Sequence, residues 1–188
     1  MKKWPFLPLF FLLLVVPAGA TTLEIGVNDY SVQLQLANPL YADDYGTVQI
    51  EGRVLYNNKE ETRLASAGLM FVGAPGNVPG LDIGVGAHLY GGRTDEKQDL
   101  LALGLGGQLT YAPPSLAGFG LGGKLFYAPQ ILSGLDADRL LETGVRISYT
   151  ATPKVLLYAE YQNLSSDFEK RGNWSIDEGV RLGFAANF

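Results

Sequence analysis

The chain has 188 residues, with 19 acidic and 14 basic side chains, a formal net charge of −5 and no cysteine. The acidic balance argues against a nucleic-acid partner, and the lack of cysteine excludes disulfides, thiol catalysis, cysteine-based metal sites and a lipid attached through cysteine. With 24 glycines, 11% aromatic residues and only 18% charged residues, the composition is unlike a charge-rich water-soluble surface and favours a strand-built membrane protein.

The first twenty residues have the pattern of a cleavable secretory signal peptide. Lys2 and Lys3 give a positive start, residues 6–16 are apolar, and the last three residues before the cleavage site are small. The apolar run is interrupted by prolines and is too short to span about 30 Å of hydrocarbon as a helix, so an uncleaved anchor is the weaker alternative. Cleavage after Ala20 leaves a mature domain, 21–188, with a net charge of 12 − 19 = −7.

After residue 46, apolar residues recur at every second position in short segments. In the first segment Val48, Ile50 and Val54 share one face, whereas Glu51 and Arg53 lie on the other. A period of two predicts a β-strand with one apolar and one mostly polar face. The same alternation is found in the segments 81–90, 101–110, 118–127, 141–150, 154–162 and 180–188, and with ambiguous phase in 63–72.

The apolar faces of these strands could form the core of a soluble sandwich or face lipid around a transmembrane barrel. Glycine favours the barrel, because it weakens a solvent-facing strand but leaves room inside a narrow lumen. The glycines on the polar faces are Gly84, Gly86, Gly104, Gly106, Gly118, Gly120, Gly122 and Gly144. A final aromatic residue, Phe188, also resembles the recognition signal of bacterial outer-membrane barrels.

Aromatic residues on the apolar faces gather at the predicted strand ends, whereas the strand middles are aliphatic. Aromatic rings prefer the interface between lipid and water, so this placement predicts membrane girdles. The predicted interface aromatics are Tyr56, Phe71, Tyr111, Phe119, Tyr127, Tyr149, Tyr161 and Phe188. We therefore predict an all-β fold, a closed antiparallel transmembrane barrel in the bacterial outer membrane.

The barrel is expected to have eight to ten strands, with ten slightly favoured. Eight strands are predicted from Thr47 onward, and residues 22–37 supply two more if the chain turns at Asn28-Asp29. Both termini are expected in the periplasm. Extracellular loops are then expected at 57–61, 91–98, 129–139 and 165–173, and periplasmic turns at 73–80, 113–117 and 151–153.

A barrel of this size has room inside mainly for its own side chains. The predicted lumen charges are Glu51, Arg53, Asp82, His88, Lys124, Glu142, Arg146, Lys154, Glu160 and Arg181. A turn centred at 151–153 places Arg146 diagonal to Glu160, within reach of an ion pair. Because buried charges must be paired, we predict a salt-bridged lumen. A narrow channel for small solutes is the alternative, although charges of both signs count against it.

His88 is the only histidine, so a Ser-His-Asp triad would depend on it. The predicted phase turns it toward the lumen, where a structural histidine is favoured over a catalytic one. A membrane-embedded hydrolase or acyltransferase using His88 is the second alternative, and it requires Ser or Asp beside this residue at the outer rim. No catalytic residue, metal site or cofactor is predicted.

The mature chain resembles the YfaZ-like family of outer-membrane proteins. The resemblance rests on Leu23-Glu24 and Gly26 followed by Asn28-Asp29-Tyr30, on the glycine-rich strands around Gly84 and Gly104, and on the terminal aromatic strand. It implies a small outer-membrane barrel and no particular activity. The expected role is structural or interactive at the cell envelope, without enzymatic activity. The expected partners are outer-membrane lipids, lipopolysaccharide, and the assembly machinery that binds the strand ending at Phe188.

Overall fold

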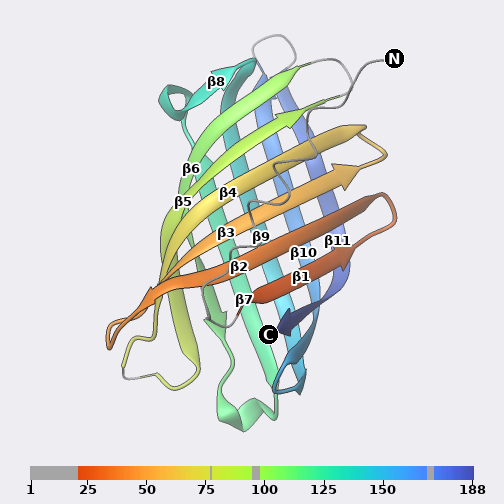
Figure 1. Cartoon of the computed structure of the whole chain (residues 1–188). Coiled ribbons are helices and arrows are strands. Elements are labelled where there is room, and N and C mark those ends of the chain that lie inside the picture. Colours follow the sequence, from red (N-terminus) through yellow and green to blue (C-terminus); the bar gives the residue numbers. More distant parts are fainter. Residues whose placement is uncertain (1–20, 77, 95–97, 169–171) are drawn as a thin grey trace.

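A computed structural model describes residues 21–76, 78–94, 98–168 and 172–188. These residues form a tilted β-barrel (Figure 1). The predicted signal peptide, residues 1–20, lies outside the described residues. The strands are β1 (Thr22–Val27), β2 (Ser31–Ala42), β3 (Thr47–Asn57), β4 (Thr62–Gly73), β5 (Leu81–Arg93), β6 (Asp99–Tyr111), β7 (Phe119–Ala128), β8 (Ser133–Leu135), β9 (Ala137–Thr152), β10 (Val155–Phe168) and β11 (Gly172–Asn187).

The sheet closes on itself because β1 pairs with both β2 and β11. Thr22 lies opposite Asn187 in one antiparallel ladder and opposite Ala37 in the other. Ten strands therefore make the wall, which confirms the favoured strand number and the turn near Asn28-Asp29. The short strand β8 continues the wall beyond the end of β7, where it pairs with the first residues of β6.

We call one end of the barrel the β8 end, because β8 lies there, and the other the terminal end, because β1 begins and β11 ends there. The β8 end carries the connections 28–30, 58–61 and 129–136, together with the strand ends Arg93, Asp99, Phe168 and Gly172. The terminal end carries the connections 43–46, 74–80, 112–118 and 153–154, together with Thr22 and Asn187. The connections of the described residues include only two single-turn 3-10 helices, η2 (Pro114–Leu116) and η3 (Gln130–Leu132). Neither is long enough to cross a membrane.

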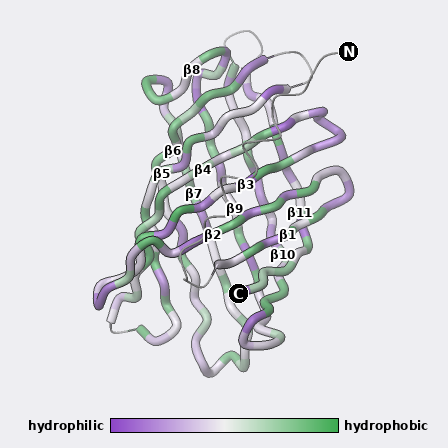
Figure 2. The backbone as a smooth tube through the Cα atoms, in the orientation of Figure 1, coloured by the Kyte–Doolittle hydropathy of each residue, from purple (hydrophilic) through white to green (hydrophobic). Residues whose placement is uncertain are grey.

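The outer wall carries a continuous apolar belt. Val145 and Leu182 are among its most exposed members, at 63% and 62%, while their neighbours in sequence point inward. Every predicted apolar face is the outer face, including Leu69 and Phe71 of the segment whose phase was ambiguous. Figure 2 shows hydrophobic positions spread over the barrel wall and hydrophilic ones gathered at several connections. So much exposed apolar surface is stable only in lipid.

Several expected loops are shorter in the structure because the strands continue past the apolar belt. β10 and β11 extend through most of the expected loop 165–173, and β5 continues to Arg93. The expected loop 129–139 contains η3, β8 and the start of β9. Backbone pairing needs no apolar side chain, so these strand ends lack the alternation by which the belt was recognised.

The turn between β9 and β10 lies one or two residues later than expected. It is formed by Pro153 and Lys154, and a bulge follows, since Val155 pairs with Thr152 but Leu156 pairs with Thr150. The bulge changes the register, so Arg146 lies directly opposite Glu160 rather than diagonal to it. Lys154 lies in the turn and is exposed.

Glycine on the inner wall makes room for large neighbours, as the composition suggested. A side chain at Gly106 would meet the backbone of Phe126, whose Cα would lie 2.6 Å from the new Cβ. Gly104 likewise lies beneath the ring of Tyr90. Small and large residues thus alternate across the lumen, which lets large side chains pack inside a narrow barrel. Gly118 is the exception, because it precedes β7 in a turn with a positive φ of 95°.

Candidate functional site

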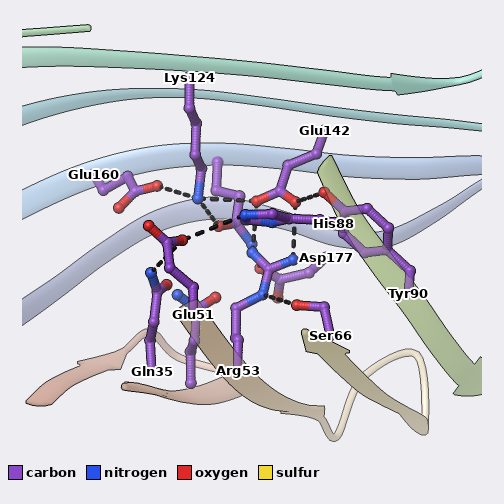
Figure 3. Close-up of polar contacts among 12 residues, drawn as sticks. Gln35, Glu51, Arg53, Ser66, His88, Tyr90, Lys124, Glu142, Glu160 and Asp177 are labelled. Atoms are coloured by element: carbon purple, nitrogen blue, oxygen red, sulfur yellow. Dashed lines mark hydrogen bonds and ion pairs between the residues drawn. The ribbon is translucent and has the colours of Figure 1, made fainter. Parts of the chain in front are cut away.

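A layer of charged side chains crosses the middle of the barrel, and Glu142 of β9 is one of its two centres. Arg53 donates to both carboxylate oxygens of Glu142 at 2.5 and 2.8 Å. Tyr90 donates its hydroxyl to the same carboxylate at 2.8 Å, and the ammonium group of Lys124 lies 2.9 Å away. Glu142 is almost fully buried. Figure 3 shows these groups converging from β3, β5, β7 and β9.

Glu160 of β10 is the second centre. Lys124 lies 2.8 Å from one of its oxygens, so this lysine bridges both centres. Arg146 donates to Glu160 at 2.6 and 3.0 Å and, on its other side, to both oxygens of Glu24 at 3.0 and 3.1 Å. The guanidinium of Arg146 also lies 4.0 Å from the centre of the Tyr158 ring. Paired and stacked in this way, the charges are largely compensated.

Arg181 of β11 anchors a third group of contacts. It donates to Asp177 at 2.7 Å, to Gln33 at 2.5 Å and to Ser31 at 3.0 Å. Gln162 donates to Asp177 at 3.1 Å and accepts from Lys124 at 2.9 Å. These contacts join Arg181 to the two carboxylate centres, so that a single polar network spans the lumen.

Glu51 and His88 lie beside this network. Nε2 of His88 is 3.4 Å from Oε2 of Glu51, without the alignment of a hydrogen bond. Gln49 and Gln35 donate to the Glu51 carboxylate at 2.7 and 3.4 Å. The His88 ring stacks on Phe126, with ring centres 4.3 Å apart.

The structure places eight of the ten predicted lumen charges in these contacts: Glu51, Arg53, His88, Lys124, Glu142, Arg146, Glu160 and Arg181. The other two lie elsewhere. Asp82 is exposed at the start of β5, near the terminal end, and Lys154 is exposed in the turn before β10. At the ends of strands the alternation no longer determines which side chains are enclosed.

Two charged members of the network were missed in the sequence. Glu24 lies in the short strand β1, in a segment whose phase was not interpreted. Asp177 is hidden by a bulge, because Leu164 pairs with Asp177 and Ser165 with Ser175, which leaves Ile176 unpaired. Both Ile176 and Asp177 are buried. A bulge reverses the phase of alternation, so only the charge of Asp177 within a predicted membrane domain could have indicated it.

The lumen toward the β8 end is filled by apolar side chains, which the expectation of a purely salt-bridged interior did not include. This apolar plug consists of Leu55, Leu64, Tyr90, Leu100, Ala102, Ala128, Ala137, Leu140, Leu164, Phe168 and Ile176, with Trp174 packed against it. Leu140 and Leu164 are completely buried. The plug closes the β8 half of the barrel much as a soluble core fills its interior.

Truncation of the plug is expected to destabilise the barrel strongly. Leu140→Ala removes a fully buried side chain from a close-packed cluster, so we expect a loss of about 2–5 kcal/mol in the free energy of unfolding. The measurement is denaturant unfolding in vesicles, followed by the fluorescence of Trp174, the only tryptophan after residue 20. Leu141→Ala, which removes the neighbouring outward side chain, is the matched control. Equal losses in both variants would contradict a packed plug.

A cavity of about 90 Å³ lies on the other side of the charged layer. Its walls include Gln108, Thr110 and Gly122, which lie toward the terminal end, as well as Glu51 and Lys124 of the charged layer. The interior is therefore polarised along the barrel axis, with an apolar plug, a charged layer and a polar cavity in succession.

The geometry offers little for catalysis. His88 lies five residues before the end of β5, inside the lumen and not at the rim. Its close polar neighbour is Glu51, and the nearby Ser66 hydroxyl instead accepts from Arg53 at 3.2 Å. Among the residues that the structure describes, no group of three or more His, Asp or Glu side chains could hold a metal ion.

The eight predicted interface aromatics are all exposed on the outer surface: Tyr56, Phe71, Tyr111, Phe119, Tyr127, Tyr149, Tyr161 and Phe188. Tyr161 differs from the expectation, because it lies in the middle of β10 rather than at a strand end. Its hydroxyl donates to Glu178 at 2.9 Å, so polar groups begin at this level on β11. β10 continues well beyond that level.

Solved structures and a protein-family model show which known proteins this chain resembles. A KdgM porin in complex with disordered oligogalacturonate resembles the chain with a TM-score of 0.46 and 15% identity, over 90% of this chain and 99% of the porin. A structure from work on the in-meso crystallization of membrane proteins has a TM-score of 0.43 and 14% identity, over 90% and 83% of the two chains. No curated protein matches. The family model described as YfaZ precursor matches residues 6–188, and the chain therefore belongs to the YfaZ family of outer-membrane β-barrel proteins.

Proposed function

We propose that this protein is a non-enzymatic outer-membrane barrel closed by its own side chains, with a structural or interactive role at the cell envelope. The observation that carries the proposal is the charged layer, in which Arg53, Lys124, Arg146 and Arg181 each contact a buried carboxylate. Breaking a buried pair leaves an uncompensated charge, which costs about 3–5 kcal/mol. An ion passing through the lumen would have to disrupt these contacts and then cross the apolar plug.

The orientation follows from the chemistry of the connections. We place the β8 end outside the cell, because its connections carry Lys59, Glu60, Glu61 and Asp136. At the terminal end the two longest turns, 74–80 and 112–118, are rich in proline and glycine and uncharged, and acidic residues occur only in 43–46. In this orientation the charged residues of the β8-end connections lie level with the head groups of lipopolysaccharide. The cavity opens toward the periplasm, and the apolar plug faces the exterior.

Export and insertion belong to the same proposal. Residues 1–20 direct the chain across the inner membrane and are removed near Ala20. The assembly machinery then binds the last strand, β11, which leads to Phe188. Mass spectrometry of the outer-membrane form tests the cleavage, since Thr21 is the expected first residue.

A narrow channel for small solutes is the second candidate, and the cavity is the observation that favours it. The lining of the cavity runs from Thr110, one residue before the terminal end of β6, to Glu51 and Lys124 of the charged layer. A continuous path would require the plug to move aside. A channel of this kind would give discrete steps of ionic current. Lys124→Gln would change the ion selectivity of the channel, because Lys124 lies on the path.

Conductance in planar bilayers separates the two candidates. For the closed barrel we expect no steady single-channel conductance from the purified protein, with a general porin as the positive control. Steady current steps whose ion selectivity changes in Lys124→Gln would overturn the closed barrel and support the channel. The mobility of boiled and unboiled samples on a gel shows that each preparation is folded.

A further inference from the structure

The permanent positive charges of the charged layer are fewer than its carboxylates. Among the described residues of this layer, four side chains carry a permanent positive charge, namely Arg53, Lys124, Arg146 and Arg181. Five carboxylates face them: Glu24, Glu51, Glu142, Glu160 and Asp177. One negative charge is left over in an interior where an uncompensated charge costs several kcal/mol.

Glu51 is the carboxylate of this layer that has no lysine or arginine in ion-pair contact within the described part of the chain. Glu142 and Glu160 each have two such partners, and Glu24 and Asp177 each have one. Glu51 instead accepts from two glutamine amides and is 5% exposed. Among the residues that the structure describes, the basic group within ion-pair distance of its carboxylate is Nε2 of His88, at 3.4 Å.

His88 is placed to supply the missing positive charge. Its Nε2 atom is buried and has no hydrogen-bond partner in the described part of the chain. The His88 ring is held between the Phe126 ring of β7 and Gly68 of β4. Any side chain at position 68 would collide with the His88 ring. This position aims the unpartnered nitrogen at Glu51, as Figure 3 shows.

The other charged groups around His88 are already engaged. On β3, Arg53 is bound to Glu142, and on β5 the Tyr90 hydroxyl donates to the same carboxylate. On β7, Lys124 lies between Glu142 of β9 and Glu160 of β10. The facing positions of β4 and β6 are Gly68 and Gly104, which carry no charge.

We propose that Glu51 and His88 form a proton-binding site in the lumen, in which one proton taken up by His88 neutralises the charged layer. The site rests on the proposed closed lumen, because bulk water in an open channel would screen the extra charge. Both residues line the cavity that leads toward the terminal end, so the proton exchanges with the periplasm.

The ring nitrogens of His88 give a direct test, because it is the only histidine in the chain. The protein is expressed with ¹⁵N-histidine and without a polyhistidine tag, folded in detergent micelles, and observed by NMR at pH 7. We expect both ring nitrogens to show the shifts of an imidazolium ion. In Glu51→Gln, which removes the counter-charge but keeps the shape, we expect the imidazolium signal to be lost and a neutral ring to replace it.

Glu24→Gln is the matched control, since Glu24 lines the same cavity but is paired with Arg146. Its His88 signal should remain that of an imidazolium. A neutral ring in the wild-type barrel at pH 7 would overturn the proposal, as would an imidazolium that persists in Glu51→Gln. Failure of the closed barrel is recognised separately, because it produces conductance in bilayers whatever the state of His88.

Discussion

Glu142→Ala is expected to destabilise the barrel by about 3–5 kcal/mol, the cost of leaving a buried ion-pair partner alone. The carboxylate accepts from Arg53 and Tyr90 and lies beside Lys124. Lys124 keeps Glu160 and Gln162 in the variant, whereas Arg53 keeps the uncharged hydroxyl of Ser66 and the face of the Tyr90 ring but no described carboxylate in ion-pair contact. Most of the loss in the free energy of unfolding is therefore expected from the unpaired charge of Arg53. Guanidinium unfolding in lipid vesicles, read from Trp174 fluorescence, measures it.

Two control variants show whether burial is the cause. Arg93→Ala breaks an equally short ion pair with Asp99, but these side chains are exposed, so the expected change is about 0–1 kcal/mol. The double variant Arg53→Met with Glu142→Met removes both buried charges and is expected to be less damaging than Glu142→Ala. If Glu142→Ala and Arg93→Ala were equally mild, the charged layer would not be a dry, paired structure.

Val145→Arg should be nearly as harmful, although the side chain lies on the outside. Val145 lies at the middle of β9, and its side chain is exposed on the outer wall. A charged residue facing lipid at the midplane of a barrel costs about 2–4 kcal/mol, whereas the same residue facing water costs little. The free energy of unfolding in vesicles provides the measurement.

Thr152→Arg, at the terminal end of the same strand, is the control for this substitution. Near the interface an arginine costs only about 0–1 kcal/mol, so the two variants should differ clearly. Equal tolerance of arginine at both positions would mean that the apolar face does not contact lipid. The inner and outer faces of every strand would then have to be exchanged.

The sequence predicted the barrel wall well because the wall follows a local rule. Each strand in the membrane must place apolar side chains on one face, and a period of two is visible without knowledge of the partner strand. The phase of β3 could be read in this way, whereas the turn at Asn28-Asp29 and the favoured number of ten strands followed from the even strand number of a closed barrel. The rule fails where it no longer applies. Lys154 was predicted inside the lumen but lies in the turn before β10. Tyr161 was predicted at a strand end but lies in the middle of β10, because that strand continues beyond the lipid.

The charged layer was only partly predictable, because its partners come from distant strands and depend on register. The pair Arg146 and Glu160 was expected from one hairpin, but a bulge places them directly opposite each other. The pair Arg53 and Glu142 joins β3 to β9 across the lumen, and Asp177 joins the layer only because Ile176 is unpaired in a second bulge. Alternation cannot reveal an extra residue that reverses its own phase.

The amino-acid sequence by itself determined the closed strand-built wall, its apolar outer face and the glycine-rich inner face, because these follow from the alternation that lipid imposes on each strand. Only the tertiary structure decided how the lumen is divided into the apolar plug, the charged layer and the cavity. That division depends on which side chains meet across the barrel, and closure brings together residues such as Arg53 and Glu142 from strands that are far apart in the sheet. The tilt and register of all ten strands set these meetings, and no single segment encodes them.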